Sequence, residues 1–262
     1  MSVWQQFLKF SRFSWALYLA SLRLEVLLLV LIPRGLFQAL FFVMLAQAAG
    51  GYELARFALI GNVLHVTALY AVIWMNAVIE AEKWNGTLIF RVAAPGNWLI
   101  SMLGLSVANY TTVFAIGMTA YVLLIPFFAP DITLLNFLRA IPLLALTVVS
   151  VGALGWLIGS LAFTTRWAEL FANVIAYSMM IVCGINFPIT ALPEAVQGFS
   201  RYIPLTNGLL AVRAVIDGAP YVEALPFMGR ELALGLVFGG AAWLAFHYRL
   251  SALRRSGNFE MV

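Results

Sequence analysis

Long apolar runs dominate this sequence and limit the folds that it can adopt. Six runs have about the 20 residues that one helix needs to cross the hydrocarbon layer of a membrane. They cover residues 26–48, 57–79, 98–124, 138–163, 170–187 and 227–246. Because 63% of the residues are hydrophobic and only 10% are charged, a soluble domain of this length could not hide the apolar surface. The chain is therefore predicted to be an all-α integral membrane protein with six transmembrane helices.

The positions of Lys and Arg predict how these spans are oriented. With the N-terminus placed in the cytoplasm, ten of the 15 basic residues fall at or near the cytoplasmic ends of spans. The outer side holds Arg56, Arg139, Arg201, Arg213 and Arg230. Cations near span ends collect on the cytoplasmic side of a membrane. We therefore expect a multi-pass protein of the cell (inner) membrane, in contact with the lipid bilayer, with both termini in the cytoplasm.

The first 25 residues are predicted to form an amphipathic helix that lies in the membrane interface without crossing it. One helical face would carry Trp4, Phe7, Leu8, Trp15, Tyr18, Leu19 and Leu22, with polar and basic residues toward the other face. The alternatives are a helix packed on a protein partner and, less in keeping with so many aromatic residues, a cleaved signal peptide. Residues 26–250 would then form the six-span domain, and residues 251–262 a cytoplasmic tail.

A polar island, residues 80–95, separates the second span from the third. It is longer than a minimal hairpin and is patterned: the charged Glu80, Glu82 and Lys83 open a helical turn, and Pro95 closes the segment. The other residues that we single out here are Trp84, Asn85, Gly86, Thr87, Leu88, Ile89 and Arg91. Trp84, Leu88 and Ile89 supply an apolar patch, so the island is predicted to dock on another protein. The alternative is an ordinary loop.

The segment between the fifth and sixth spans, residues 188–222, is rich in residues that disfavour a regular spanning helix. Pro188, Pro193 and Pro204 would each kink or end a helix. Arg213 would be costly at the centre of the bilayer. Pro193 suits the first turn of a helix, and Gly218 suits a helix end. We expect two short helices that dip into the outer leaflet and return.

These two segments together resemble the ABC-2-type exporter permeases, the transmembrane subunits of one class of ABC transporter. The island has the order acid-x-acid-basic, then Gly-Thr-Leu, then Ala-Pro, as in the first cytoplasmic coupling helix of that family. The later segment runs Gly184-Ile-Asn-Phe-Pro188, Leu-Pro193, Ile-Pro204-Leu-Thr and Ala-Val-Arg213. The pair before Gly86-Thr87, often charged in the family, is Trp84-Asn85 here, which makes the contact surface more apolar.

The resemblance implies an exporter built of two six-span permeases and two cytoplasmic ABC ATPase subunits. The second permease would be the same chain or a paralogue. The ATPases would bind ATP and Mg, because this chain has no Gly-rich phosphate loop and no cofactor of its own. The island would be the coupling helix. With a single cysteine, no metal-ligand cluster and no hydrolytic triad, we predict no catalytic or metal site. Its basic residues flank spans, so no nucleic acid partner is expected.

Polar residues within the spans give the candidate translocation path, because such groups face a protein interior or water. The predicted lining is Phe37, Phe41, Asn62, His65, Leu69, Ile73, Asn173, Tyr177 and Met180. It suits a hydrophobic or amphipathic cargo: a drug, a lipid or a lipid-linked molecule. The alternative for the polar stripes is ordinary hydrogen bonding between helices. Gly152, Gly155 and Gly159 of the fourth span are predicted to allow close helix packing.

Two functions of other classes compete with this one. A secondary transporter driven by an ion gradient usually has acidic residues inside its spans next to broken helices. The spans here are expected to be nearly free of acids, with Glu25, Glu80 and Glu169 near their cytoplasmic ends. A membrane-embedded enzyme needs several titratable groups at one depth, whereas His65 stands nearly alone.

Overall fold

The chain is described by a computed structural model that covers residues 2–21, 24–87, 90, 97–163 and 167–256. Every regular element in these residues is helical, which confirms the all-α prediction. The elements are α1 (Val3–Ser21), α2 (Leu24–Val26), a π-helical stretch (Leu27–Leu31), α3 (Ile32–Trp84), α5 (Trp98–Phe128), α6 (Leu134–Gly159), a 3₁₀ turn (Ser160–Phe163), α7 (Ala168–Val182), a 3₁₀ turn (Ile189–Ala191), α8 (Glu194–Ser200), α9 (Thr206–Ile216) and α10 (Tyr221–Ser256).

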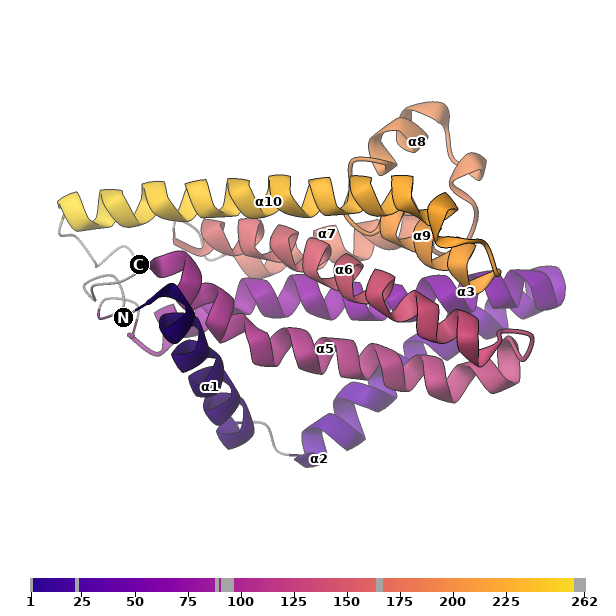
Figure 1. The fold of residues 1–262 in the computed structure, drawn as a ribbon, viewed down its shortest axis with the longest axis horizontal. Coiled ribbons are helices and arrows are strands. Elements are labelled where there is room, and N and C mark those ends of the chain that lie inside the picture. The colour runs from indigo at the N-terminus through magenta and orange to yellow at the C-terminus, as the bar shows by residue number, and fades with distance from the viewer. Residues whose placement is uncertain (1, 22–23, 88–89, 91–96, 164–166, 257–262) are drawn as a thin grey trace.

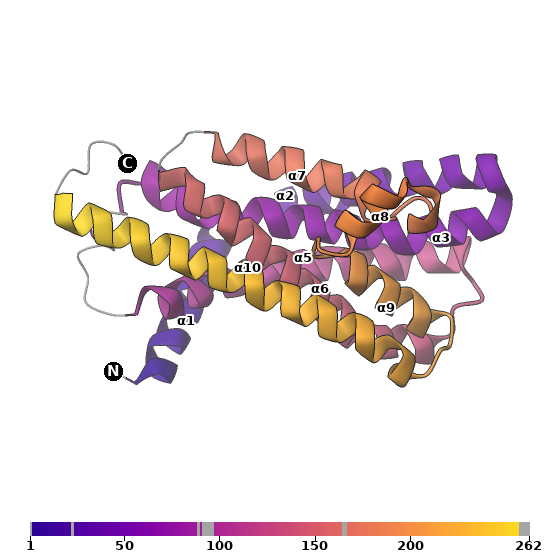
Figure 2. The same cartoon turned by 90° about the horizontal axis from the view of Figure 1, so that it is seen from above.

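The long helices form an elongated bundle. α5, α6, α7, α10 and the second half of α3 run along its long axis, and the first half of α3 approaches them obliquely (Figures 1 and 2). Four helical stretches are long and apolar enough to cross a membrane: Leu27–Trp84, Trp98–Phe128, Leu134–Gly159 and Tyr221–Ala252. α7 has 15 residues, so it is about 22 Å long, shorter than the ~30 Å hydrocarbon layer. The six-span layout therefore stays a prediction.

α3 is a hairpin of two antiparallel helical arms that meet at Gly51. Gly51 has φ 72° and ψ −159°, a backbone conformation that residues other than glycine rarely adopt. The arms touch along their length: Tyr70 donates to the carbonyl of Leu31 at 3.4 Å, and Gly35 faces Val66. We call the end of the bundle that holds Gly51 the hairpin end. The start of α1 and the end of α10 lie at the opposite end, which we call the terminal end (Figure 1).

Local sequence signals explain where the third predicted span begins and where the fifth one ends. α5 starts at Trp98 as predicted, because the side chain of Asn97 accepts hydrogen bonds from the amides of Leu99 (3.0 Å) and Ile100 (3.5 Å). The fifth span was predicted to reach residue 187, but α7 ends at Val182. Gly184 stops it, since its φ of 72° is incompatible with a right-handed helix.

The second arm of α3 is the centre of the molecule, with nearly all residues from Ala55 to Val72 buried. Small residues on the neighbouring helices let them approach closely, as predicted for the fourth span. A Cβ at Gly155 of α6 would lie 2.5 Å from the carbonyl oxygen of Val72. On the α5 side, Tyr121 donates to the carbonyl of Ile60 at 2.7 Å. Both α5 and α6 therefore pack closely against the second arm.

α1 crosses the terminal end of the bundle obliquely and packs on α5 (Figure 1). Gln6 donates to the carbonyl of Asn97 at 3.0 Å, and Gly104 leaves room for the α1 backbone. Four predicted interfacial residues form an exposed stripe: Trp4 (65% exposed), Leu8 (37%), Trp15 (36%) and Leu19 (70%). Phe7 and Tyr18 are half-buried against the bundle instead. The helix thus packs on its own chain and also leaves an apolar stripe uncovered.

Two short helices, α8 and α9, connect α7 to α10, as the proline-rich segment predicted. Pro193 immediately precedes α8. α9 ends in a paired-bond cap: the amide of Gly218 donates to Val215 at 3.1 Å, and that of Ala219 donates to Ala214 at 2.9 Å. Gly218 has φ 91°, which explains its place there. α8 projects from the side of the bundle near the hairpin end (Figure 1).

Candidate functional site

The described part of the island begins as the end of α3. Glu80, Glu82 and Lys83 lie in the last turns of α3, so the helical turn that they were predicted to open continues the helix of the second predicted span. The helix runs on past the apolar span because these residues favour helix. Asn85 ends it, and Gly86 follows with φ 65°.

A hydrogen-bonded turn fixes the chain directly after α3. The Thr87 amide donates to the carbonyl of Glu82 at 3.0 Å, and the Thr87 hydroxyl donates to its carboxylate at 2.6 Å. Trp84, at the end of the helix, is 85% exposed. Leu88, Ile89, Arg91 and Pro95 lie outside the described residues. The island therefore presents an indole on the end of a helix whose middle, residues 58–72, is buried in the core.

A groove of about 340 Å³ opens beside this turn, between α1, α3 and α5. Tyr18 and Trp74 supply aromatic walls, and Glu82, Asn85 and Asn109 supply polar groups. The sequence did not predict this groove, because it depends on the angle at which α1 crosses α5. It places α1 next to two of the predicted coupling residues.

The predicted path residues of the second span lie inside the single chain. Asn62, His65 and Leu69 are each at most 2% exposed. Asn62 donates to the side chain of Asn186 at 2.7 Å, and His65 Nε2 lies 3.0 Å from the carbonyl oxygen of Ala176 in α7. The first contact joins α3 to the segment that follows α7, and the second joins α3 to α7 itself, so both match the packing alternative that the sequence left open. They do not place these side chains on an open cavity.

The other predicted path residues are nearer the surface. Phe37 is 69% exposed, Phe41 is 62% exposed and Tyr177 is 44% exposed. The half-buried ones are Ile73, Asn173 and Met180. The structure does not gather the nine residues around one cavity of this chain. A path between two permeases, which these exposed aromatic residues would line, stays a prediction.

Arg213 of α9 joins three segments at the hairpin end. Its guanidinium donates to the carbonyls of Gly184 (2.8 Å), Ile185 (2.9 Å) and Phe57 (3.1 Å), and it lies 3.4 Å from the centre of the Phe57 ring. The first two carbonyls follow the C-terminus of α7, where a cation is favoured. The side chain is only 8% exposed. Arg213 thus lies in the short helix α9 and in the protein interior, and the dip of this helix into the outer leaflet stays a prediction.

Glu231 of α10 is fully buried and bonds backbone amides at the start of α9, as Arg213 bonds backbone carbonyls after the end of α7. Its two carboxylate oxygens accept hydrogen bonds from the amides of Leu205 (2.9 Å) and Gly208 (3.0 Å). Pro204 directly precedes this junction, and Leu205 has φ 101°. The side chain of Leu205, the residue before α9, caps no amide, so the carboxylate of another helix accepts from Gly208 in the first turn of α9 instead. The expectation that the spans are nearly free of acids is wrong at this position.

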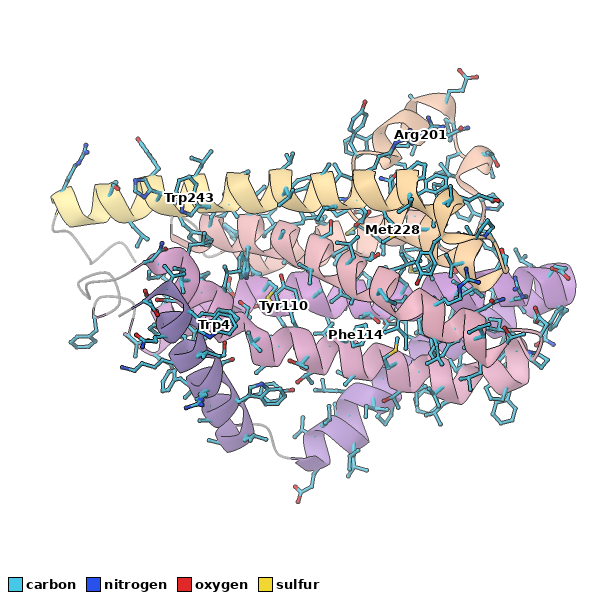
Figure 3. The ribbon with its side chains drawn as sticks, in the orientation of Figure 1. Trp4, Tyr110, Phe114, Arg201, Met228 and Trp243 are labelled. Atoms are coloured by element: carbon cyan, nitrogen blue, oxygen red, sulfur yellow. The ribbon has the colours of Figure 1, made fainter. Side chains whose placement is uncertain are left out.

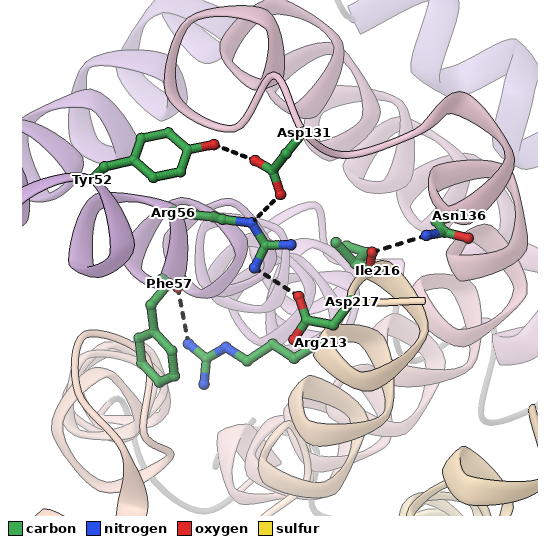
Figure 4. Close-up of polar contacts among 8 residues, drawn as sticks. All are labelled: Tyr52, Arg56, Phe57, Asp131, Asn136, Arg213, Ile216 and Asp217. Atoms are coloured by element: carbon green, nitrogen blue, oxygen red, sulfur yellow. Dashed lines mark hydrogen bonds and ion pairs between the residues drawn. The ribbon is translucent and has the colours of Figure 1, made fainter. Parts of the chain in front are cut away.

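An ionic network joins the outermost turns at the hairpin end (Figure 4). Arg56 of α3 lies 2.8 Å from Asp131, in the turn between α5 and α6, and 2.6 Å from Asp217, which follows α9. Tyr52 also donates to Asp131. This hydrogen bond and the charge of Arg56 lower the pKa of Asp131. The network holds the α3 hairpin, the α5–α6 turn and α9 together.

Comparison with known proteins gives one recurrent relative. The chain resembles Nodulation protein J. It is 26% identical to that of Rhizobium leguminosarum bv. trifolii over 95 residues, 36% of each chain. For Rhizobium meliloti (strain 1021) the identity is 27% over 88 residues, 34% of each chain. For Bradyrhizobium diazoefficiens it is 30% over 81 residues, 31% of each chain. No family model matches the chain.

The alignments span about a third of the length of these relatives. This low-identity similarity to Nodulation protein J is consistent with an ABC-2-type permease. The apolar helices of the described residues fit a multi-pass membrane protein.

Proposed function

We propose that this chain is the permease subunit of an ATP-driven exporter of the ABC-2 type. The observation that carries the proposal is the placement of the two ABC-2-like segments. The described part of the island lies at the terminal end, and α8 and α9 lie toward the hairpin end (Figure 1). That is the arrangement expected if the first contacts a cytoplasmic ATPase and the second lies in the outer leaflet. The similarity to Nodulation protein J supports the same function.

In this proposal, two ATPase subunits bind ATP and Mg, and each holds one island. Exposed aromatic residues are common anchors of protein interfaces, so Trp84 is the residue proposed to enter the ATPase. Trp84 ends the same helix that carries Asn62 and His65 through the core. A push on Trp84 would therefore move the second arm of α3 as one body, together with the α7 and α9 segments bonded to it. Such coupling biases a two-state element from a distant site.

The cargo is proposed to be hydrophobic or amphipathic: a drug, a lipid or a lipid-linked molecule. It would leave the cytoplasm or inner leaflet through a space between this permease and a second one, either a copy or a paralogue. The exposed Phe37, Phe41 and Tyr177 support this class of cargo, because aromatic and apolar surfaces bind apolar groups.

The test is co-expression with an ABC ATPase encoded beside this chain. The two proteins should co-purify from membranes, and the complex should hydrolyse ATP at a rate that cargo changes. The chain purified alone should hydrolyse none. Robust hydrolysis by the chain alone, free of contaminants, would contradict the proposal.

A second candidate, a transporter driven by an ion gradient, is favoured by one observation. Glu231 is an acidic residue buried in a candidate span, next to the interrupted backbone at Leu205. Secondary transporters often combine these two features. Both carboxylate oxygens are engaged by amides, which fits a structural cap better than an ion site. Uptake or efflux that follows an imposed proton gradient without ATP, and stops in Glu231→Gln, would favour this second function.

A further inference from the structure

A groove of about 490 Å³ lies between α8 and the first half of α10. α8 projects from the bundle near this point, and Arg201 follows the last residue of α8 (Figures 1 and 3). The residues that matter for its chemistry are Arg201, Tyr202, Arg230, Ala233, Leu234 and Val237. Neither the path nor the coupling segment of the proposed function uses this groove.

The groove is amphipathic and basic. Arg201 and Arg230 supply two cations, and none of its lining residues is acidic. Among the described residues, the ion pairs are those of Arg56, which is not part of the groove, so neither groove arginine is in an ion pair there. The remaining wall is apolar and open, with Val237 64% exposed. Two arginines above an apolar wall match an anionic head group with a hydrocarbon tail, because guanidinium groups bind phosphate with paired hydrogen bonds.

The position of the groove along α10 agrees with such a ligand. α10 has 36 residues, so it is about 54 Å long. A hydrocarbon layer of about 30 Å centred on it would begin about 12 Å from Tyr221. Arg230 is nine residues into the helix, about 14 Å, and so lies at this boundary. Ala233, Leu234 and Val237 lie deeper, at the depth of acyl chains.

We infer that this groove binds an anionic phospholipid of the leaflet at the hairpin end. The phosphate would sit between Arg201 and Arg230, and an acyl chain would lie along the apolar face of α10. A bound lipid would hold α8 against α10. The inference rests on the proposed membrane placement but not on ATPase coupling, so it is tested by lipid binding without transport.

The test measures how fast a cysteine in the groove reacts with uncharged N-ethylmaleimide. Gly198→Cys is suitable, because Gly198 lines the groove and a Cβ there meets no atom within 4 Å. The parent, whose Cys183 is buried, gives the background rate of labelling. The full chain is placed in nanodiscs of phosphatidylcholine, with or without phosphatidylglycerol of the same acyl chains. Phosphatidylglycerol should slow the reaction. Each of Arg201→Gln and Arg230→Gln should weaken that protection about fivefold, the typical contribution of one basic residue near an anionic surface.

The matched control is Arg139→Gln, which removes an arginine at the hairpin end but outside the groove. It should keep the protection. Arg201→Lys and Arg230→Lys keep the charge and serve if a Gln variant does not fold; they should retain partial protection. Equal protection by phosphatidylcholine, by dissolved glycerol phosphate, or in the two Gln variants would overturn the inference. Equal protection by phosphatidylcholine would indicate an apolar site, and equal protection by dissolved glycerol phosphate would indicate a site for a soluble anion.

Discussion

Glu231 of α10 accepts the amide hydrogen of Leu205 at 2.9 Å, 26 residues earlier in the chain. Leu205 has φ 101°, which costs free energy for a residue with a side chain. The buried carboxylate offsets that cost by bonding the first free amides of α9. This contact sets where α9 begins. Arg213 of α9 in turn donates hydrogen bonds to the carbonyls that follow the end of α7.

Removing this cap should loosen the hairpin end. Glu231→Gln replaces one acceptor oxygen with an amide donor that faces a backbone N–H, so it leaves a buried donor unsatisfied. Such a loss costs about 1–3 kcal/mol. Thermal unfolding of the purified protein in detergent should show a lower midpoint. Glu223→Gln, an exposed acid of the same helix, is the control and should unfold like the parent. An unchanged midpoint for Glu231→Gln would show that the carboxylate does not hold α9.

The α3–α7 junction depends on Gly61. A Cβ there would lie 2.2 Å from the carbonyl oxygen of Ile185 and 2.8 Å from the guanidinium of Arg213. Gly61→Ala should therefore push the end of α7 away and cost about 1–3 kcal/mol, as overpacking commonly does. Gly229→Ala, where a Cβ meets nothing within 4 Å, is the matched control. Equal midpoints of unfolding for the two variants would contradict this account of the junction.

The Arg56 network should depend on pH through Asp131. The hydrogen bond from Tyr52 and the charge of Arg56 lower the pKa of this carboxyl in the folded state. Its contribution to stability is therefore present above the unfolded pKa, about 4, and is lost as the pH falls through the lower folded value. The side chain is half exposed, so the contribution is at most about 1 kcal/mol.

The measurement compares the parent with Asp131→Asn over a range of pH. The parent should unfold at a slightly higher temperature at pH 7, and the two midpoints should converge in acid. Added salt should shrink the difference, because exposed ion pairs are screened. A difference that grows as the pH falls would mean that the sign of the pKa shift is wrong.

Cysteine labelling tests the orientation. Cysteines placed at Ser2 and Asn85 should react only from the cytoplasmic side, and cysteines at Tyr52 and Gln197 should react from outside. The two sets lie at opposite ends of the bundle, so a membrane-impermeant maleimide applied to intact cells distinguishes them. Labelling of Asn85 from outside would invert the topology and remove the island from any cytoplasmic ATPase.

Much of the fold could be predicted from the sequence because each long helix is encoded by a local run of apolar residues. The start of α5 was predictable to the residue, since Asn97 is a favourable cap directly before that run. The end of α7 was misplaced by five residues, although Gly184 was visible. Hydrophobicity continues through Ile185 and Phe187, and it does not report the backbone angle that ends the helix.

The polar contacts were harder to predict, because they join segments far apart in the chain. Glu231 lies beside Arg230 in the sequence, and nothing local shows that its carboxylate reaches the start of α9. Arg213 was expected in a short helix, but its burial depends on carbonyls that α3 and the end of α7 bring to it. The predicted path residues show the same limit. Their helical spacing places them on one face of a helix, but it does not distinguish a face that lines a path from a face that packs against another helix.

The most direct test of the central claim is ATPase binding by Trp84→Ala. Loss of an anchor residue at an interface costs about 2 kcal/mol or more, roughly a 30-fold weaker complex. The control is Trp4→Ala, because Trp4 is also mostly exposed and belongs to α1 at the same end. Lys83→Ala should have a smaller effect, since charges at the rim of an interface mainly change association rate. The measurement is a pull-down of the co-expressed ATPase, normalised to the amount of permease in the membrane. We predict that Trp84→Ala loses most of the ATPase while Trp4→Ala keeps it; full retention of the ATPase by Trp84→Ala would contradict the proposed coupling.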